Sequence, residues 1–182
     1  MESYYSIDPD YDLTDQWHLA WPRTAGGEEI VSGVMSLGQR WNPEDKLYSS
    51  IYSSGRQVNF YRGTSVFFLS ARIMNVLRLA VGEVCVQGVP VEIEGVNEPF
   101  EILNVLDIVD CLDEGLSGLS WRLDSDGRRH YVVNRLKVDA AKAAGHDLFR
   151  VETWPVALVC SKRIRDLLLA GGVTGVTFTP VT

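Results

Sequence analysis

One pattern that occurs twice constrains the fold of this chain more than any other feature of its sequence. In residues 67–91 and again in residues 158–180, an apolar run ends at a serine, a short apolar-striped segment follows, and a β-branched run comes after a glycine. An offset of 91 residues places Ser161 on Ser70. Two copies favour two related strand–helix–strand units on a shared core, because a solenoid requires three or more repeats.

Each copy predicts a helix that begins directly after its serine, whose hydroxyl can accept a hydrogen bond from a free amide of the first turn. In the first copy, apolar residues recur at three- and four-residue spacing from Ile73 to Ala80, which predicts a helix over residues 71–81 with one apolar face. Gly82 is suited to end this helix. The next run predicts a strand in which Pro90 favours an edge or bulge position.

The segment between the copies predicts further strands and short helical turns. Residues 100–106 are typical of a strand, after which Asp107 is placed to cap a short helical turn. Residues 119–138 contain two alternating runs on either side of Asp124–Gly127, which predicts a hairpin. Asp139 is expected to cap a brief helix. The whole pattern predicts an α+β fold with a mixed, largely antiparallel sheet and a few short helices.

Residues 1–64 are aromatic, rich in glycine and serine, and only weakly periodic. Prolines at positions 9, 22 and 43 disfavour a helix across those points. We therefore expect an irregular N-terminal arm packed on an α+β core of residues 65–182. The arm should bury three tryptophans that are too apolar to leave in water, namely Trp17, Trp21 and Trp41.

The composition is that of a globular protein, with 46% hydrophobic and 23% charged residues and no apolar run near the length of a membrane span. No secretion signal is recognisable, so we expect a cytoplasmic protein. The three cysteines are far apart and lack the spacing of a zinc site, which favours small buried hydrophobic residues: Cys85, Cys111 and Cys160.

The formal net charge of −7 disfavours nucleic acid as a partner. It would attract a basic partner protein, although an acidic surface is also a common way to remain soluble.

Several charged clusters have the residue types of a chemical site. Lys162, Arg163 and Arg165 lie on the first turn of the second predicted helix, where an anion could bind, but the glycines for close backbone approach are absent there. Four carboxylates could hold a divalent cation or act as caps: Asp107, Asp110, Asp113 and Glu114. The histidines at positions 18, 130 and 146 form no recognisable catalytic motif. We therefore expect no catalytic residues, no metal and no cofactor.

One alternative is a nucleotide- or ADP-ribose-related enzyme or a small-ligand binder. Arg62–Ser65 together with Glu92 and Glu94 have the residue types of an ADP-ribosyltransferase site. These segments are closer in sequence than the usual three-strand layout of such a site. The alternative requires Arg62, Glu92 and Glu94 to meet in one cleft.

A partner-binding surface is the other candidate, because tyrosines among small polar residues are typical of protein-binding surfaces. The same tyrosines could instead cover the edge of the core. The candidate contact residues all lie in the predicted arm: Asp10, Asp12, Asp15, Glu44, Asp45, Tyr48, Tyr52 and Tyr61.

Three stretches of the chain resemble one family of immunity proteins. They are "YYSIDPDYDL", "FEILNVLDIVDCLD" and the closing "HDLFRVETWPVALVCSKRIRDLLLAGGVTGVTFTPV". The chain is similar in these to the family numbered eleven among the immunity proteins of bacterial polymorphic toxin systems, formerly a domain of unknown function and common in myxobacteria. The segment after Ser161 departs from the family in being basic and then apolar, and residues 25–62 match least.

The resemblance implies a non-enzymatic cytoplasmic protein that binds and neutralises a cognate toxin. A general protein-interaction module without a toxin partner stays open as a further alternative.

Overall fold

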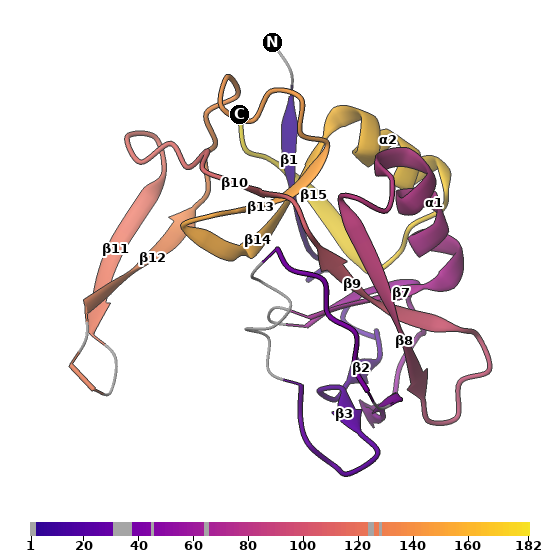
Figure 1. Cartoon of the computed structure of the whole chain (residues 1–182). Coiled ribbons are helices and arrows are strands. Elements are labelled where there is room, and N and C mark those ends of the chain that lie inside the picture. Colours follow the sequence, from indigo (N-terminus) through magenta and orange to yellow (C-terminus); the bar gives the residue numbers. More distant parts are fainter. Residues whose placement is uncertain (1–2, 31–37, 45, 64–65, 124–125, 128) are drawn as a thin grey trace.

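The computed structural model describes residues 3–30, 38–44, 46–63, 66–123, 126–127 and 129–182, which form two larger sheets, two small ones and two helices (Figure 1). The six-stranded sheet has the order β3 (Arg23–Thr24), β4 (Leu47–Ser49), β8 (Val86–Ile93), β9 (Phe100–Val105), β7 (Phe67–Ser70) and β6 (Phe60–Arg62). The five-stranded sheet has the order β10 (Ile108–Val109), β13 (Leu148–Val151), β14 (Trp154–Ser161), β1 (Tyr4–Pro9) and β15 (Val176–Pro180). The small sheets pair β2 (His18–Leu19) with β5 (Ile51–Ser53) and β11 (Gly118–Leu123) with β12 (Arg129–Arg135). The helices are α1 (Ala71–Val81) and α2 (Lys162–Ala170).

The pairing confirms the predicted α+β class. Among the described strand pairs, β4–β8 and β10–β13 are parallel, and the remaining pairs are antiparallel. The β11–β12 hairpin projects from the body of the molecule, as Figure 1 shows. Of the expected hairpin turn, Asp124 and Ser125 lie outside the described residues.

The two repeated units have the same topology, and each contains one strand that lies outside the sequence repeat. In the first unit, β9 lies between β7 and β8 and is antiparallel to both. In the second, β1 lies in the same way between β14 and β15. The matching outer strands are β6 on β7 and β13 on β14, so the order β6-β7-β9-β8 corresponds to β13-β14-β1-β15. The central strand of the second unit is therefore supplied by the N-terminal end of the chain.

Residues 1–64, which we expected to form an irregular arm, contribute strands to both larger sheets. Tyr4 and Ile7 of β1 are fully buried, and β1 lies between β14 and β15 in the five-stranded sheet. Strands β3, β4 and β6 belong to the six-stranded sheet. The weak periodicity of this segment arises because its strands are short, at two to six residues each.

The two helices lie side by side and share one core with the sheets (Figure 1). Helix α1 buries Ile73, Met74 and Leu77, and α2 buries Ile164 and Leu168. Full burial of such a side chain contributes roughly 1.5–3 kcal/mol. Ile164 and Leu168 occupy the positions of Ile73 and Leu77 in the repeat, so burial of these two pairs is a main reason for it. No helix of the described residues is long and apolar enough to cross a membrane.

The two cap serines differ. Ser161 accepts a hydrogen bond on Oγ from the Ile164 amide at 3.4 Å, as predicted. Ser70 occupies the equivalent position before α1, but its hydroxyl makes no cap bond and is buried without a hydrogen-bond partner among the residues that the structure describes. Gly82 ends α1 with a positive φ of 78°, as expected.

Two local predictions need correction. Residues after Asp107 form strand β10 rather than a helical turn, because they pair with β13. Asp139 does accept bonds from the amides of Ala141 and Lys142, but it caps hydrogen-bonded turns and not a helix. Pro90 lies in β8 just before the three residues that pair with β4, and among the described strands it pairs only with β9. At Pro90 the side of β8 toward β4 is therefore an unpaired edge, as expected.

Candidate partner-binding surface

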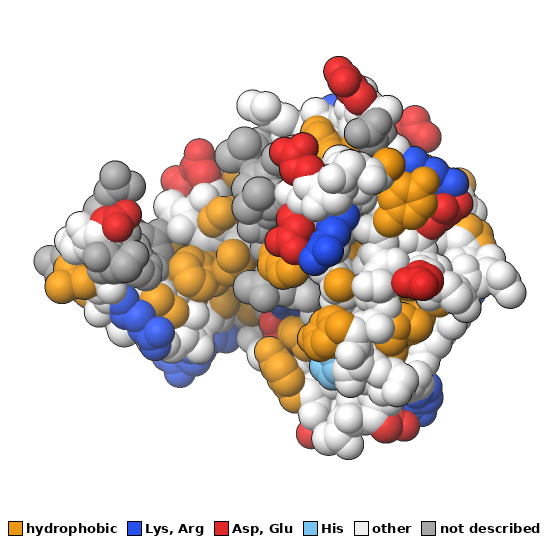
Figure 2. Space-filling view, turned by 90° about the horizontal axis from the view of Figure 1, so that it is seen from below, with side chains coloured by type: hydrophobic (Ala, Val, Ile, Leu, Met, Phe, Trp, Pro, Cys, Tyr) orange, Lys and Arg blue, Asp and Glu red, His pale blue; other side chains and the backbone are white. Residues whose placement is uncertain are grey.

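Two adjacent pockets lie on one face of the molecule and share the residues Ala20, Trp21 and Arg23. The larger has a volume of about 770 Å³ and the smaller about 400 Å³. Strands β2 and β3 occupy the underside in Figure 1, and Figure 2 shows exposed hydrophobic side chains on that underside with charged groups among them.

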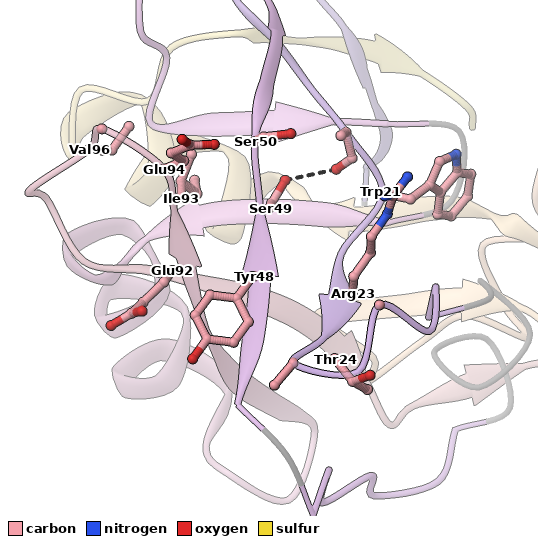
Figure 3. Close-up of a pocket in the computed structure, with 14 residues that line it drawn as sticks. Trp21, Arg23, Thr24, Tyr48, Ser49, Ser50, Glu92, Ile93, Glu94 and Val96 are labelled. Carbon is pink, nitrogen blue, oxygen red and sulfur yellow. Dashed lines mark hydrogen bonds between the residues drawn. The ribbon is translucent and has the colours of Figure 1, made fainter.

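The larger pocket is built on strand register. Arg23 pairs with Tyr48 across β3 and β4, and Tyr48 pairs with Glu92 across β4 and β8, so these three side chains lie next to one another. In β4 the neighbours Leu47 and Ser49 are buried while Tyr48 faces outward. The Ser49 hydroxyl donates to the Ala20 carbonyl at 2.8 Å, which fixes the segment that carries Trp21 (Figure 3).

Ion pairs neutralise part of this pocket. The ammonium of Lys46 is bonded to the Glu92 carboxylate, which raises the pKa of Lys46, and it lies 5.8 Å from the centre of the Tyr48 ring. Arg23 donates to Glu29 at 2.8 Å. Glu94 also lines the pocket, is exposed, and makes no ion pair with any other residue that the structure describes.

The smaller pocket brings Tyr52 and Tyr61 together around His18. The His18 ring centre lies 5.7 Å from that of Tyr52 and 6.2 Å from that of Tyr61. Tyr52 is 67% exposed, whereas Tyr61 is 7% exposed and packs on Phe68. Burial raises the pKa of Tyr61 to about 12. Of the two, Tyr52 is available to a partner and Tyr61 supports the core.

The predicted acidic contact residues lie elsewhere. Asp10 and Asp12 follow β1, where the Asp10 amide donates to the Gly175 carbonyl and the Asp12 amide to the Asp10 carboxylate. Asp15 lies 3.7 Å from Arg56. Glu44 lines a separate pocket, and Asp45 lies outside the described residues. The four described acids line neither of the two adjacent pockets.

Sequence analysis did not select the residues that join the two pockets. Trp21 was expected to be buried but is 40% exposed, while Trp17 is buried as expected. Arg23 carries no motif, and Glu94 was considered only for the enzyme alternative; the pairing of β3 and β8 with β4 is what brings them to one pocket.

The residues of the enzyme alternative are not brought together. Arg62 is largely buried and bonded to the carbonyl of Ile7 and the carboxylate of Asp8, away from Glu92 and Glu94. In the six-stranded sheet, β9 and β7 lie between β8 and β6. Ser65 lies outside the described residues.

The remaining charged clusters are paired internally. Lys162 and Arg165 both bond to Asp166, and Arg163 bonds to Asp147. Asp107 bonds to His146 at 2.8 Å, and Asp110 lies 3.9 Å from Lys142. Asp113 accepts a hydrogen bond from the Leu116 amide. Within the described ranges, no group of three or more potential ligands could hold a metal ion.

The cysteines are free thiols in the positions expected of small hydrophobic residues. Cys111 and Cys160 are buried, and Cys85 is partly buried. Burial raises the pKa of all three thiols, that of Cys111 to about 12. They are therefore not activated nucleophiles.

Comparison with known protein families gives a match. The model of the immunity protein family Imm11 matches residues 53–182. This range includes both helices and strand β8, which contributes to the larger pocket. It begins one residue after Tyr52, so the pocket residues Trp21, Arg23 and Tyr48 also precede it. No curated protein matches the chain. Because the match covers well over half of the sequence and includes both copies of the repeated sequence pattern, the chain belongs to the immunity protein family Imm11.

Proposed function

We propose that this protein is a cytoplasmic, non-enzymatic immunity protein that binds the toxin of a polymorphic toxin system and neutralises it. The observation that carries the proposal is the pair of adjacent pockets, with exposed aromatic rings, on the surface of a chain that belongs to an immunity protein family.

Three rings make this surface suited to a protein partner. Trp21, Tyr48 and Tyr52 are 40%, 39% and 67% exposed, and Trp and Tyr are the residue types that contribute most often to the centre of an interface. They provide large contact areas and lose little conformational entropy. The carboxylates at the pocket margins, together with the formal net charge of −7, favour a toxin with a basic contact surface.

The test requires the toxin that this protein neutralises. We would take as the candidate a neighbouring gene product that is toxic when expressed alone, and measure both its direct binding to this protein and survival on co-expression. We expect a stoichiometric complex and protection by the wild-type chain.

The double variant Trp21→Ala/Tyr52→Ala should lose most of the protection and bind at least about tenfold more weakly, as expected for interface aromatic residues. The matched control is Leu79→Ala/Leu169→Ala, which removes two exposed apolar side chains from the helices. Equal protection by both double variants would contradict this surface, and protection without a complex would contradict neutralisation by binding.

A further inference from the structure

We propose that the larger pocket is the receptor for an arginine side chain of the partner protein. This inference rests on the proposed function for the identity of the partner, but its chemistry can be tested without the toxin. An arginine-binding pocket gives the exposed aromatic surface a specific recognition element.

The lining of the pocket matches a guanidinium group. Figure 3 shows the rings of Tyr48 and Trp21 and the carboxylates of Glu92 and Glu94, which come from three neighbouring segments of the fold. A guanidinium stacks on aromatic rings and donates to carboxylates in a planar fork. The volume of about 770 Å³ accommodates such a side chain and leaves room for its backbone at the rim.

The charges within the pocket leave one carboxylate for an incoming cation. Glu29 neutralises Arg23 and Lys46 neutralises Glu92. Glu94 has no such partner among the residues that the structure describes, and its side chain is exposed at the pocket. An arginine of the partner that bonded to Glu94 would give this carboxylate an oppositely charged group, as Lys46 does for Glu92.

The protein already holds a cation of its own next to this wall. Lys46 lies over the Tyr48 ring and bonds to Glu92, so a carboxylate and an aromatic ring here favour a positive charge. An ammonium group from the partner would have to compete with Lys46 for the Tyr48 ring and the Glu92 carboxylate. A guanidinium can instead lie flat against a ring while it reaches Glu94, which favours arginine over lysine.

The experiment uses the full-length protein and a soluble arginine probe. Nα-acetyl-argininamide would be titrated into the isotope-labelled protein while backbone amide and Trp indole signals are followed, with Nα-acetyl-citrullinamide as the neutral isostere. We expect saturable shifts at Tyr48, at residues 92–96 and at the Trp21 indole with the arginine probe only, and weaker binding at high salt.

A matched pair of variants separates this site from general attraction to an acidic surface. Glu94→Gln should weaken binding of the arginine probe about tenfold, the size expected for loss of a charge-assisted hydrogen bond. Glu114→Gln, which changes another exposed carboxylate outside the pocket, should leave it unchanged.

Equal shifts with citrulline, or equal effects of the two variants, would overturn the arginine receptor. Such a result would leave the toxin protection assay unaffected, so the two proposals fail separately.

Discussion

Arg62 on β6 donates to the Asp8 carboxylate on β1 at 2.9 Å, and this bond joins the two larger sheets. The same guanidinium donates to the carbonyl of Val156 on β14 at 3.0 Å. The Arg62 side chain is only 11% exposed, and its charge centre lies 5.5 Å from the Phe67 ring centre. It therefore satisfies acceptors from two neighbouring strands of the five-stranded sheet at once.

Replacing Arg62 should destabilise the protein strongly. In Arg62→Met, the partly buried acceptors lose their donor while most of the side-chain volume stays, so we expect a loss of about 2–4 kcal/mol in the free energy of unfolding. Chemical denaturation would measure it. The control is Arg56→Met, whose ion pair with Asp15 is exposed, with an expected change below about 0.5 kcal/mol. Similar losses in both variants would refute a special role for the buried arginine.

The two cap serines should respond oppositely to the same substitution. Ser161→Ala removes the acceptor of the Ile164 amide and a bond to Asp147, so we expect a loss of about 1–2 kcal/mol. Ser70→Ala removes a buried hydroxyl for which the described part of the chain supplies no hydrogen-bond partner, so it should be neutral or slightly stabilising. Thermal unfolding of both variants is the measurement. A loss at Ser70 as large as that at Ser161 would show that the hydroxyl has an equivalent role in both units.

Tyr61 should make stability fall in alkaline solution. Burial raises its pKa from 10.0 to about 12, so the folded state keeps a proton that the unfolded state releases. Its contribution is fully present below pH 10.0 and is lost as the pH rises toward about 12. The unfolding free energy of Tyr61→Phe should decline less than that of the wild type across this window. Parallel curves for the two proteins would rule out this linkage, and Tyr11→Phe, at an exposed tyrosine, is the control.

The acidic residues outside the pockets should affect the rate of toxin binding more than the affinity. Asp12→Lys and Glu44→Lys reverse exposed charges, which are expected to steer a basic partner rather than to hold it. We predict slower association and a weaker dependence on salt, with a smaller change in affinity than Tyr52→Ala produces. Stopped-flow or surface-based kinetics at two salt concentrations would measure this. If both the affinity and its salt dependence were unchanged, these acids would not belong to the binding surface.

The local elements were predictable from the sequence because their signals are local. The apolar stripe beginning at Ile73, Gly82 at the end of α1, and the strand that contains Pro90 each depend on spacing or backbone conformation within a few residues. The same local signals failed at Ser70 and Asp107. There, tertiary packing decided whether a hydroxyl was bonded and whether a strand or a turn formed.

The candidate site was only partly predictable because its pockets depend on contacts between distant segments. Tyr48 and Tyr52 were selected as aromatic residues in a polar setting, and the structure places both at pockets. Glu92 joins Tyr48 only through the parallel pairing of β4 with β8, which bridges more than forty residues of sequence. Trp21 gave no signal that it would stay exposed.

The position of β1 between β14 and β15 has a consequence for how the protein is made. The first unit, from β6 to β9, is continuous in sequence and can form while synthesis is still in progress. The second cannot close until residues up to Pro180 have left the ribosome, because β1 waits for partners at the other end of the chain. Contacts of such long sequence separation form slowly. The fold is therefore complete only when β15 has been made and has paired with β1.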